Sequence, residues 1–220
     1  MSGHFTPAFF TFFADLAVHN DLAWFADNNT RYVTDVERPM LAFIGDVGAR
    51  LAAVSPSFVA NRRRIGGSMV PIQRNTRFAG DAAPFRTSTA ARFQHRGPYD
   101  GSRPAFYVHL APGHCFGGGG IYHADPSTIA RVRQAIVSSP EEWLRVRALA
   151  EDDPDRLKRV PAGFDRAHPF AEDLMRKNFF ALASFSEDDV ISADFVDRYL
   201  ASCHRAAPLV AFITGALGLP

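Results

Sequence analysis

The chain has 220 residues and a mass of 24.2 kDa, of which 47% are hydrophobic and 21% charged, and its formal net charge is +1. This composition is typical of a globular protein and excludes an intrinsically disordered chain, a collagen-like repeat and a low-complexity segment. A net charge so close to zero also argues against a protein that binds nucleic acid with its whole surface.

Cysteine content and hydropathy indicate the compartment. The two cysteines, Cys115 and Cys203, are far apart in the sequence and cannot make a disulfide framework, which favours a reducing environment. The apolar N-terminal stretch follows no lysine or arginine and is interrupted by Asp15, unlike a signal peptide. No run approaches the ~20 apolar residues of a membrane helix, so we expect a soluble cytoplasmic protein.

The first quarter of the chain predicts helices. Apolar residues at helical spacing indicate one over 7–19, a second over 21–35 with Asp21 as its N-cap, and a third over 38–53. Residues 1–56 therefore form a predicted N-terminal helical layer.

Short apolar or alternating segments begin after Gly66-Gly67 and are separated by Gly, Pro and Asp, which is typical of antiparallel strands. A tight turn is expected at Pro112-Gly113. The run from Gly117 to Gly120 lacks the spacing of a phosphate-binding loop, so we interpret it as close packing of sheet against helix. The predicted strands are 69–72, 90–94, 105–110 and 115–122.

The remaining chain is predicted to be mostly helical. Helices are expected from Asp125-Pro126 to about 138, after Ser139-Pro140, over 168–178 and from Ser192 for about twenty residues, the last bent or interrupted by Pro208. Residues 179–185 are expected to form a buried strand. The fold class predicted is α+β, an antiparallel β-sheet flanked by helices, in a single domain over 1–220 with a helical layer (1–56), a strand-rich basic part (66–122) and a part with helices plus one strand (123–220).

Arginine is strongly enriched, with 22 arginines and two lysines, which genomic base composition explains in bulk. Its distribution is more informative. Residues 62–103, here called the basic segment, hold nine arginines and two acidic residues and carry +7, whereas the rest of the chain carries −6. The positive charge is therefore concentrated in the middle of the sequence and not in a terminal tail.

Several blocks in chain order resemble a family of bacterial and fungal proteins, the domain of unknown function 2461 family. The resemblance spans nearly the whole chain and implies one compact domain, with no established reaction. The blocks are Phe5-Thr6-Pro7, Phe12-Phe13, Leu16, Asn20, Trp24-Phe25, Asn28, Arg31-Tyr32, Pro39, Arg74 to Asp81, Pro84-Phe85-Arg86, Tyr107 to Leu110, Gly117 to Gly120, Leu157-Lys158-Arg159, Pro161, Gly163-Phe164, His168-Pro169, Lys177 and Phe179.

The first candidate site groups Arg74, Arg77 and Arg86 around Asp81. Guanidinium groups bind phosphate or carboxylate through paired donors, and a nearby acid orients one of them. The alternative is that Asp81 pairs with an arginine only to brace a long loop.

A second candidate combines Lys158, Arg159 and His168 on a loop fixed by proline and glycine. Lys177, one of two lysines in an arginine-rich chain, is a candidate for chemistry that needs a deprotonatable amine, or else an exposed helix-end lysine.

Strand alternation places His109 on the same face as Tyr107, either in a ligand cleft or packed under a helix. The pair His123 and Asp125 does not predict a metal site, because Asp125 precedes Pro126 as a helix cap.

Three functions remain open. The first is a basic cleft for a small anionic ligand, phosphate or carboxylate, with or without acid–base catalysis; its catalytic candidates are His109, Asp81 and Lys177, and its ligand-binding candidates are Arg74, Arg77, Arg86, Lys158, Arg159 and His168. The second is a noncatalytic nucleic-acid or phosphoprotein-binding module, in which Arg62, Arg63 and Arg64 act with Phe78, Phe85 and Phe93. The third is a structural or protein-interaction domain. Cofactor, oligomeric state and membrane association are not indicated.

Overall fold

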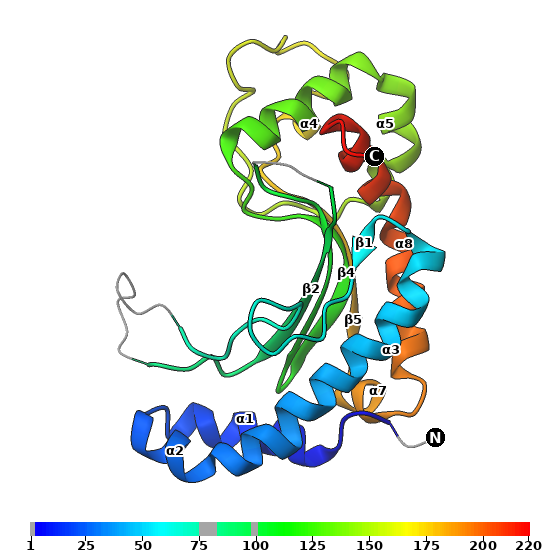
Figure 1. Cartoon of the computed structure of the whole chain (residues 1–220). Coiled ribbons are helices and arrows are strands. Elements are labelled where there is room, and N and C mark those ends of the chain that lie inside the picture. Colours follow the sequence, from blue (N-terminus) through cyan, green and yellow to red (C-terminus); the bar gives the residue numbers. More distant parts are fainter. Residues whose placement is uncertain (1–2, 75–82, 98–100) are drawn as a thin grey trace.

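The structure is a computed structural model that describes residues 3–74, 83–97 and 101–220. Within these residues, a five-stranded antiparallel sheet has the strand order β1-β2-β3-β4-β5, and helices flank it (Figure 1). This confirms the predicted α+β class. The strands are β1 (Phe58–Val59), β2 (Thr89–His95), β3 (Ala105–Ala111), β4 (His114–Ile121) and β5 (Phe179–Phe185).

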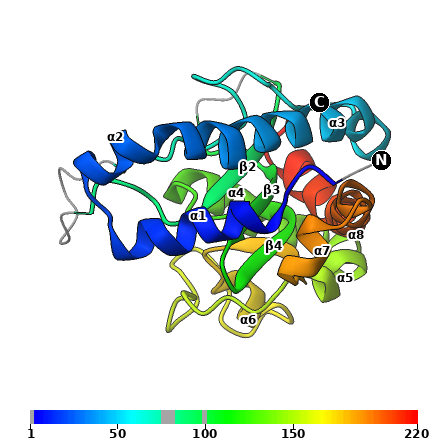
Figure 2. The same ribbon diagram turned by 90° about the horizontal axis from the view of Figure 1, so that it is seen from below.

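The N-terminal helices follow the predicted pattern. They are α1 (Pro7–Val18), α2 (Leu22–Arg31) and α3 (Arg38–Val54), and a π-helical segment, Tyr32–Glu37, joins α2 to α3 without a break. The Asp21 side chain caps α2 by accepting a hydrogen bond of 2.9 Å from the backbone N–H of Trp24, as predicted. Figures 1 and 2 show α1 and α2 at one end of the sheet, with α1 in contact with the π-helical segment.

The C-terminal part contains α4 (Pro126–Ser138), α5 (Pro140–Val146), a 3₁₀ turn (Arg147–Leu149), α6 (Ala171–Leu174), α7 (Glu187–Ile191) and α8 (Phe195–Ala216). The long C-terminal helix is confirmed, although it begins at Phe195 and runs through Pro208 without interruption. Buried residues on both sides of the proline, such as Ala206 and Leu209, keep the helix packed against the sheet. No helix in the described ranges combines the length and apolar character needed to cross a bilayer.

Two sequence predictions are wrong. Residues 69–72 form no strand and only a single bridge, Met69 to Ala91, because Pro71 has no N–H to continue a ladder. The predicted helix over 168–178 is reduced to α6, because the backbone N–H groups of Lys177 and Asn178 donate to Asp153 and not to a preceding helical turn.

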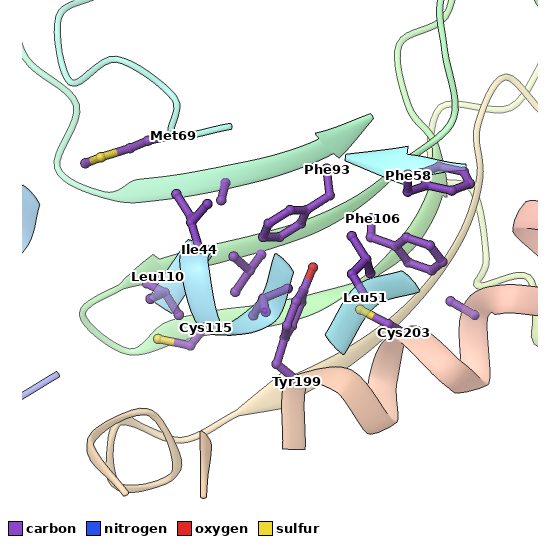
Figure 3. Close-up of a cluster of buried hydrophobic side chains, with 14 of the residues drawn as sticks. Ile44, Leu51, Phe58, Met69, Phe93, Phe106, Leu110, Cys115, Tyr199 and Cys203 are labelled. Carbon is purple, nitrogen blue, oxygen red and sulfur yellow. The ribbon is translucent and has the colours of Figure 1, made fainter. Parts of the chain in front are cut away.

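A central part of the hydrophobic core lies between α3, α8 and one face of the sheet (Figure 3). Figure 3 shows Phe93 of the sheet directed toward Tyr199 of α8, and Phe106 beside Phe58. The glycines of β4 make this approach possible. A Cβ on Gly117 would lie 2.8 Å from the Tyr199 ring, and one on Gly119 would lie 2.8 Å from Val210. The glycine run therefore serves close helix–sheet packing, as the sequence predicts.

Adding a methyl group at Gly119 is expected to destabilise the protein. A Cβ there would meet the Phe106 ring at 2.7 Å, and over-packing of this kind typically costs about 1–3 kcal/mol. Urea unfolding of Gly119→Ala measures the loss. The matched control is Gly215→Ala in α8, where nothing lies within 4 Å of the added Cβ, so stability should hold or rise by up to about 1 kcal/mol. Wild-type stability in Gly119→Ala would contradict the packing argument.

Candidate functional site on the open face of the sheet

The face of the sheet opposite α8 carries a cavity of about 890 Å³. In Figure 1, α3 and α8 cover one face of the curved sheet, whereas no helix of the described chain lies over the middle of the other face. The cavity is lined by Arg92, Gln94, Gly101, Ser102, Arg103, Ala105, Tyr107, His114, Phe116, Gly119, Gly120, Tyr122, His123, Phe180 and Leu182.

Strand alternation directs the lining side chains. On β2, Arg92 and Gln94 are exposed while the intervening Phe93 is buried in the core. Arg92 lies opposite Tyr107 on β3, which lies opposite Gly118 on β4. One rung of the ladder thus sets a guanidinium group beside a phenol.

The described lining includes two arginines and two histidines, Arg92, Arg103, His114 and His123, and it contains no aspartate or glutamate. Burial raises the pKa of Tyr107, and the positive charges of Arg92 and then Arg86 oppose this rise. Both guanidinium groups therefore favour the ionised form of the Tyr107 phenol.

His109 lies next to the cavity in an aromatic stack. Its ring packs on Phe116 at a centroid distance of 4.9 Å with an interplanar angle of 17°, and its Nδ1 lies 3.5 Å from the Tyr107 hydroxyl. Burial, and then the charge of His114, lower the pKa of His109 to about 4. The His109 imidazole is therefore neutral at pH 7, and its pKa lies below that of an ordinary histidine.

The first candidate cluster is only partly described. Arg77 and Asp81 lie outside the described residues. Arg74 donates from Nη1 to the carbonyl oxygen of Ala83 at 3.4 Å, and its backbone N–H bonds to Pro84, so it helps to hold this segment in place. Arg86 is exposed, and the positive charge it contributes acts on Tyr107.

The second candidate cluster does not reach the cavity. Lys158, Arg159 and Lys177 are exposed, and His168 uses Nδ1 to accept a hydrogen bond of 3.1 Å from the backbone N–H of Phe170. None of these four lines the cavity, so the structure does not bring them together with Arg92. The backbone of Lys177, not its ammonium group, makes the hydrogen bond that holds its segment.

A buried network supports the cavity rim. The Asp153 carboxylate, 1% exposed, accepts hydrogen bonds from the backbone N–H of Lys177 at 2.6 Å and from Asn178 through both its backbone N–H and its side-chain amide. The Asn178 side-chain oxygen then accepts from the backbone N–H of His123 at 2.8 Å. Neither Asp153 nor Asn178 lies in a local motif, so the sequence alone does not indicate their role.

Two of the three aromatic residues expected to stack on nucleic-acid bases, Phe85 and Phe93, are buried. Phe93 is buried in the core, and Phe85 is buried and stacks on Phe25 at 4.0 Å; Phe78 lies outside the described residues. Two arginines of the proposed cluster contact the protein itself: Arg62 donates to the carbonyl oxygen of Leu41, and Arg64 pairs with Glu37. These aromatic side chains therefore cannot stack on bases, which corrects the expectation for Phe85 and Phe93.

No group of three His, Cys, Asp or Glu side chains that could hold a metal ion occurs among the residues described. Asp125 acts as a helix cap, since its carboxylate accepts from the backbone N–H of Thr128 at 2.9 Å. Cys115 and Cys203 are buried free thiols.

The lowered pKa of His109 predicts a pH dependence of stability. In the unfolded chain this ring titrates near pH 6.5, so between pH 6.5 and about 4 the unfolded state binds more protons than the native state. Stability is therefore complete above pH 6.5 and falls on acidification, by about 1 kcal/mol for a ring that is partly exposed. Urea unfolding at pH 7 and pH 4.5 measures this loss of unfolding free energy. The loss should be smaller in His109→Gln than in the wild type, and the same as in the wild type in the exposed control His204→Gln. Equal falls in all three proteins would contradict the burial argument.

Removing the Asp153 carboxylate is expected to destabilise the native state. Asp153→Ala leaves buried donors of Asn178 without their acceptor, which should cost about 2–3 kcal/mol in urea unfolding. The neighbouring exposed variant Asp152→Ala should change stability by less than about 0.5 kcal/mol. Similar small effects for both would show that the network contributes little.

Comparison with known proteins identifies a family. A family model described as a conserved hypothetical protein, DUF2461, matches residues 8–212. Searches of curated proteins and of solved structures find no match to the chain. The match covers nearly the whole sequence and agrees with the resemblance seen in the sequence blocks, and the chain therefore belongs to the DUF2461 family of conserved hypothetical proteins.

Proposed function

We propose that this chain is a cytoplasmic protein whose cavity binds a small anionic ligand, a phosphate or a carboxylate compound. The observation that carries the proposal is the lining itself, which holds Arg92, Arg103, His114 and His123 and, within the described residues, no carboxylate. An anion entering the cavity can accept hydrogen bonds from the Arg92 guanidinium group. The two buried free thiols fit a reducing compartment.

Arg92 is the best placed of these groups to contact a ligand. It is exposed, it projects from the middle of a strand, and its guanidinium group offers paired donors that match two oxygens of a phosphate or carboxylate. A strand position also fixes the donor more firmly than a loop does.

Two imidazoles line the same cavity, and each can donate or accept hydrogen bonds according to its protonation state. They take the acid–base role that the sequence suggested for His109. Binding is the function proposed, and any proton transfer to the ligand falls to His114 or His123.

The proposal predicts that Arg92→Gln weakens anion binding. Titration with inorganic phosphate and with citrate, at constant ionic strength, should give affinities about ten- to a hundredfold lower than in the wild type, the usual effect of losing a hydrogen bond to a charged group. Calorimetry or thermal shift measures the binding.

The matched control is Arg63→Gln, which removes the same charge from the basic segment at an exposed residue outside the cavity. It should bind both anions as the wild type does. Equal losses in the two variants would mean diffuse attraction and overturn the proposal. Tight oligonucleotide binding with a steep salt dependence, weakened by Arg63→Gln, would favour the nucleic-acid alternative.

A further inference from the structure

We infer that the anion bound in this cavity carries a flat aromatic ring, an inference that rests on the binding function proposed above. Size is the first argument. A volume of about 890 Å³ lies in the range of roughly 300–1,000 Å³ found for sites that enclose drug-sized ligands. A bare phosphate would leave most of this space to water.

Aromatic side chains form much of the cavity wall. Tyr107 and Phe116, on adjacent strands, have ring centroids 6.0 Å apart, and Tyr122 and Phe180 have centroids 5.8 Å apart. Two aromatic pairs therefore border the same hollow that Arg92 enters. Rings of this kind bind flat partners by stacking, while an adjacent guanidinium group binds the charge.

The floor between these walls is made of small residues. On one rung of the ladder, Ala105 lies opposite Gly120, with Gln94 on one side and Phe180 on the other. A Cβ on Gly120 would lie 2.2 Å from the carbonyl oxygen of Phe179, so no larger side chain fits there. The strand pairing itself keeps the floor open to a flat group.

Tyr122 is the residue that most directly indicates a ring-bearing ligand. It is 61% exposed, although it lines the cavity and its ring lies 5.8 Å from that of Phe180. An aromatic side chain left in water at a cavity mouth gains contact area when a flat ligand covers it.

The backbone at this rim is held in an uncommon conformation. His123 has φ of +50°, and its backbone N–H donates to Asn178, which is itself bound by the buried Asp153. A non-glycine residue in the left-handed region persists only where its surroundings fix it, and such residues cluster at binding sites. The network thus fixes the chain where Tyr122 leaves β4.

Charge and ring together define the ligand class: an aromatic phosphate or carboxylate, with its anionic group at Arg92 and its ring against the aromatic wall. A ligand with charge alone would not use the aromatic side chains of the lining, and one with a ring alone would not use its arginines.

Three probes separate the two components: phenyl phosphate carries ring and charge, methyl phosphate carries the charge alone, and phenol carries the ring alone. Calorimetry with the wild-type protein should show phenyl phosphate binding about tenfold more tightly than methyl phosphate, as expected for one stacked ring. Phenol should bind more weakly than phenyl phosphate.

Variants assign each component to its residue. Tyr122→Leu should remove most of the tenfold advantage of phenyl phosphate and leave the affinity for methyl phosphate unchanged. Because the Tyr122 side chain is exposed, the substitution should leave the fold intact. Arg92→Gln should weaken both phosphates alike. Phe164→Leu, an aromatic residue outside the lining, is the control and should bind as the wild type does.

The outcomes distinguish this inference from the proposed function. Equal affinity for the two phosphates, with no effect of Tyr122→Leu, overturns the ring and leaves anion binding intact. Phenol binding as tightly as phenyl phosphate shows an apolar site and overturns the anionic function. Failure of both phosphates to bind overturns the anionic function and, with it, this inference.

Discussion

The close approach of α8 to β4 is the constraint on which the other features of the structure depend. Tyr199 and Val210 occupy the space that Cβ atoms of Gly117 and Gly119 would need. On the side of β5, the backbone leaves no room for a Cβ on Gly118 or Gly120 either. Because α8 covers one face of the sheet, the cavity lies on the other face. There, Gly118 and Gly120 of β4 have no side chain to fill it.

Arginines of the basic segment that the structure describes differ in the groups they contact. Arg62 and Arg64 reach from their loop to Leu41 and Glu37 and hold that loop against the helical layer. Arg92 instead projects from a strand whose alternate residues are buried, and it faces the cavity. The enrichment in arginine therefore does not indicate one common role, because the burial and the partners of each arginine determine its role.

Support for the cavity rim comes from residues far apart in sequence. Asp153 lies on a loop, Asn178 precedes β5 and His123 follows β4, and hydrogen bonds connect all three. A carboxylate buried to this degree requires several donors, and Lys177 and Asn178 provide them. The stability of the rim thus depends on the packing of the loop as well as on the strands.

Local patterns in the sequence predicted the antiparallel α+β class and the N-cap at Asp21, because helix periodicity and capping depend on residues within a few positions of each other. The glycine run predicted close packing of sheet against helix, but only the tertiary structure shows that Tyr199 and Val210 of α8 make this contact. The alternation of side chains along a β-strand likewise predicted that Tyr107 and His109 lie on one face. Only the tertiary structure decided that Arg92 and Arg103 line the cavity while Lys158 and Lys177 do not. That choice depends on which loops meet after folding, and no short segment encodes long-range contacts such as the one between Asp153 and Asn178.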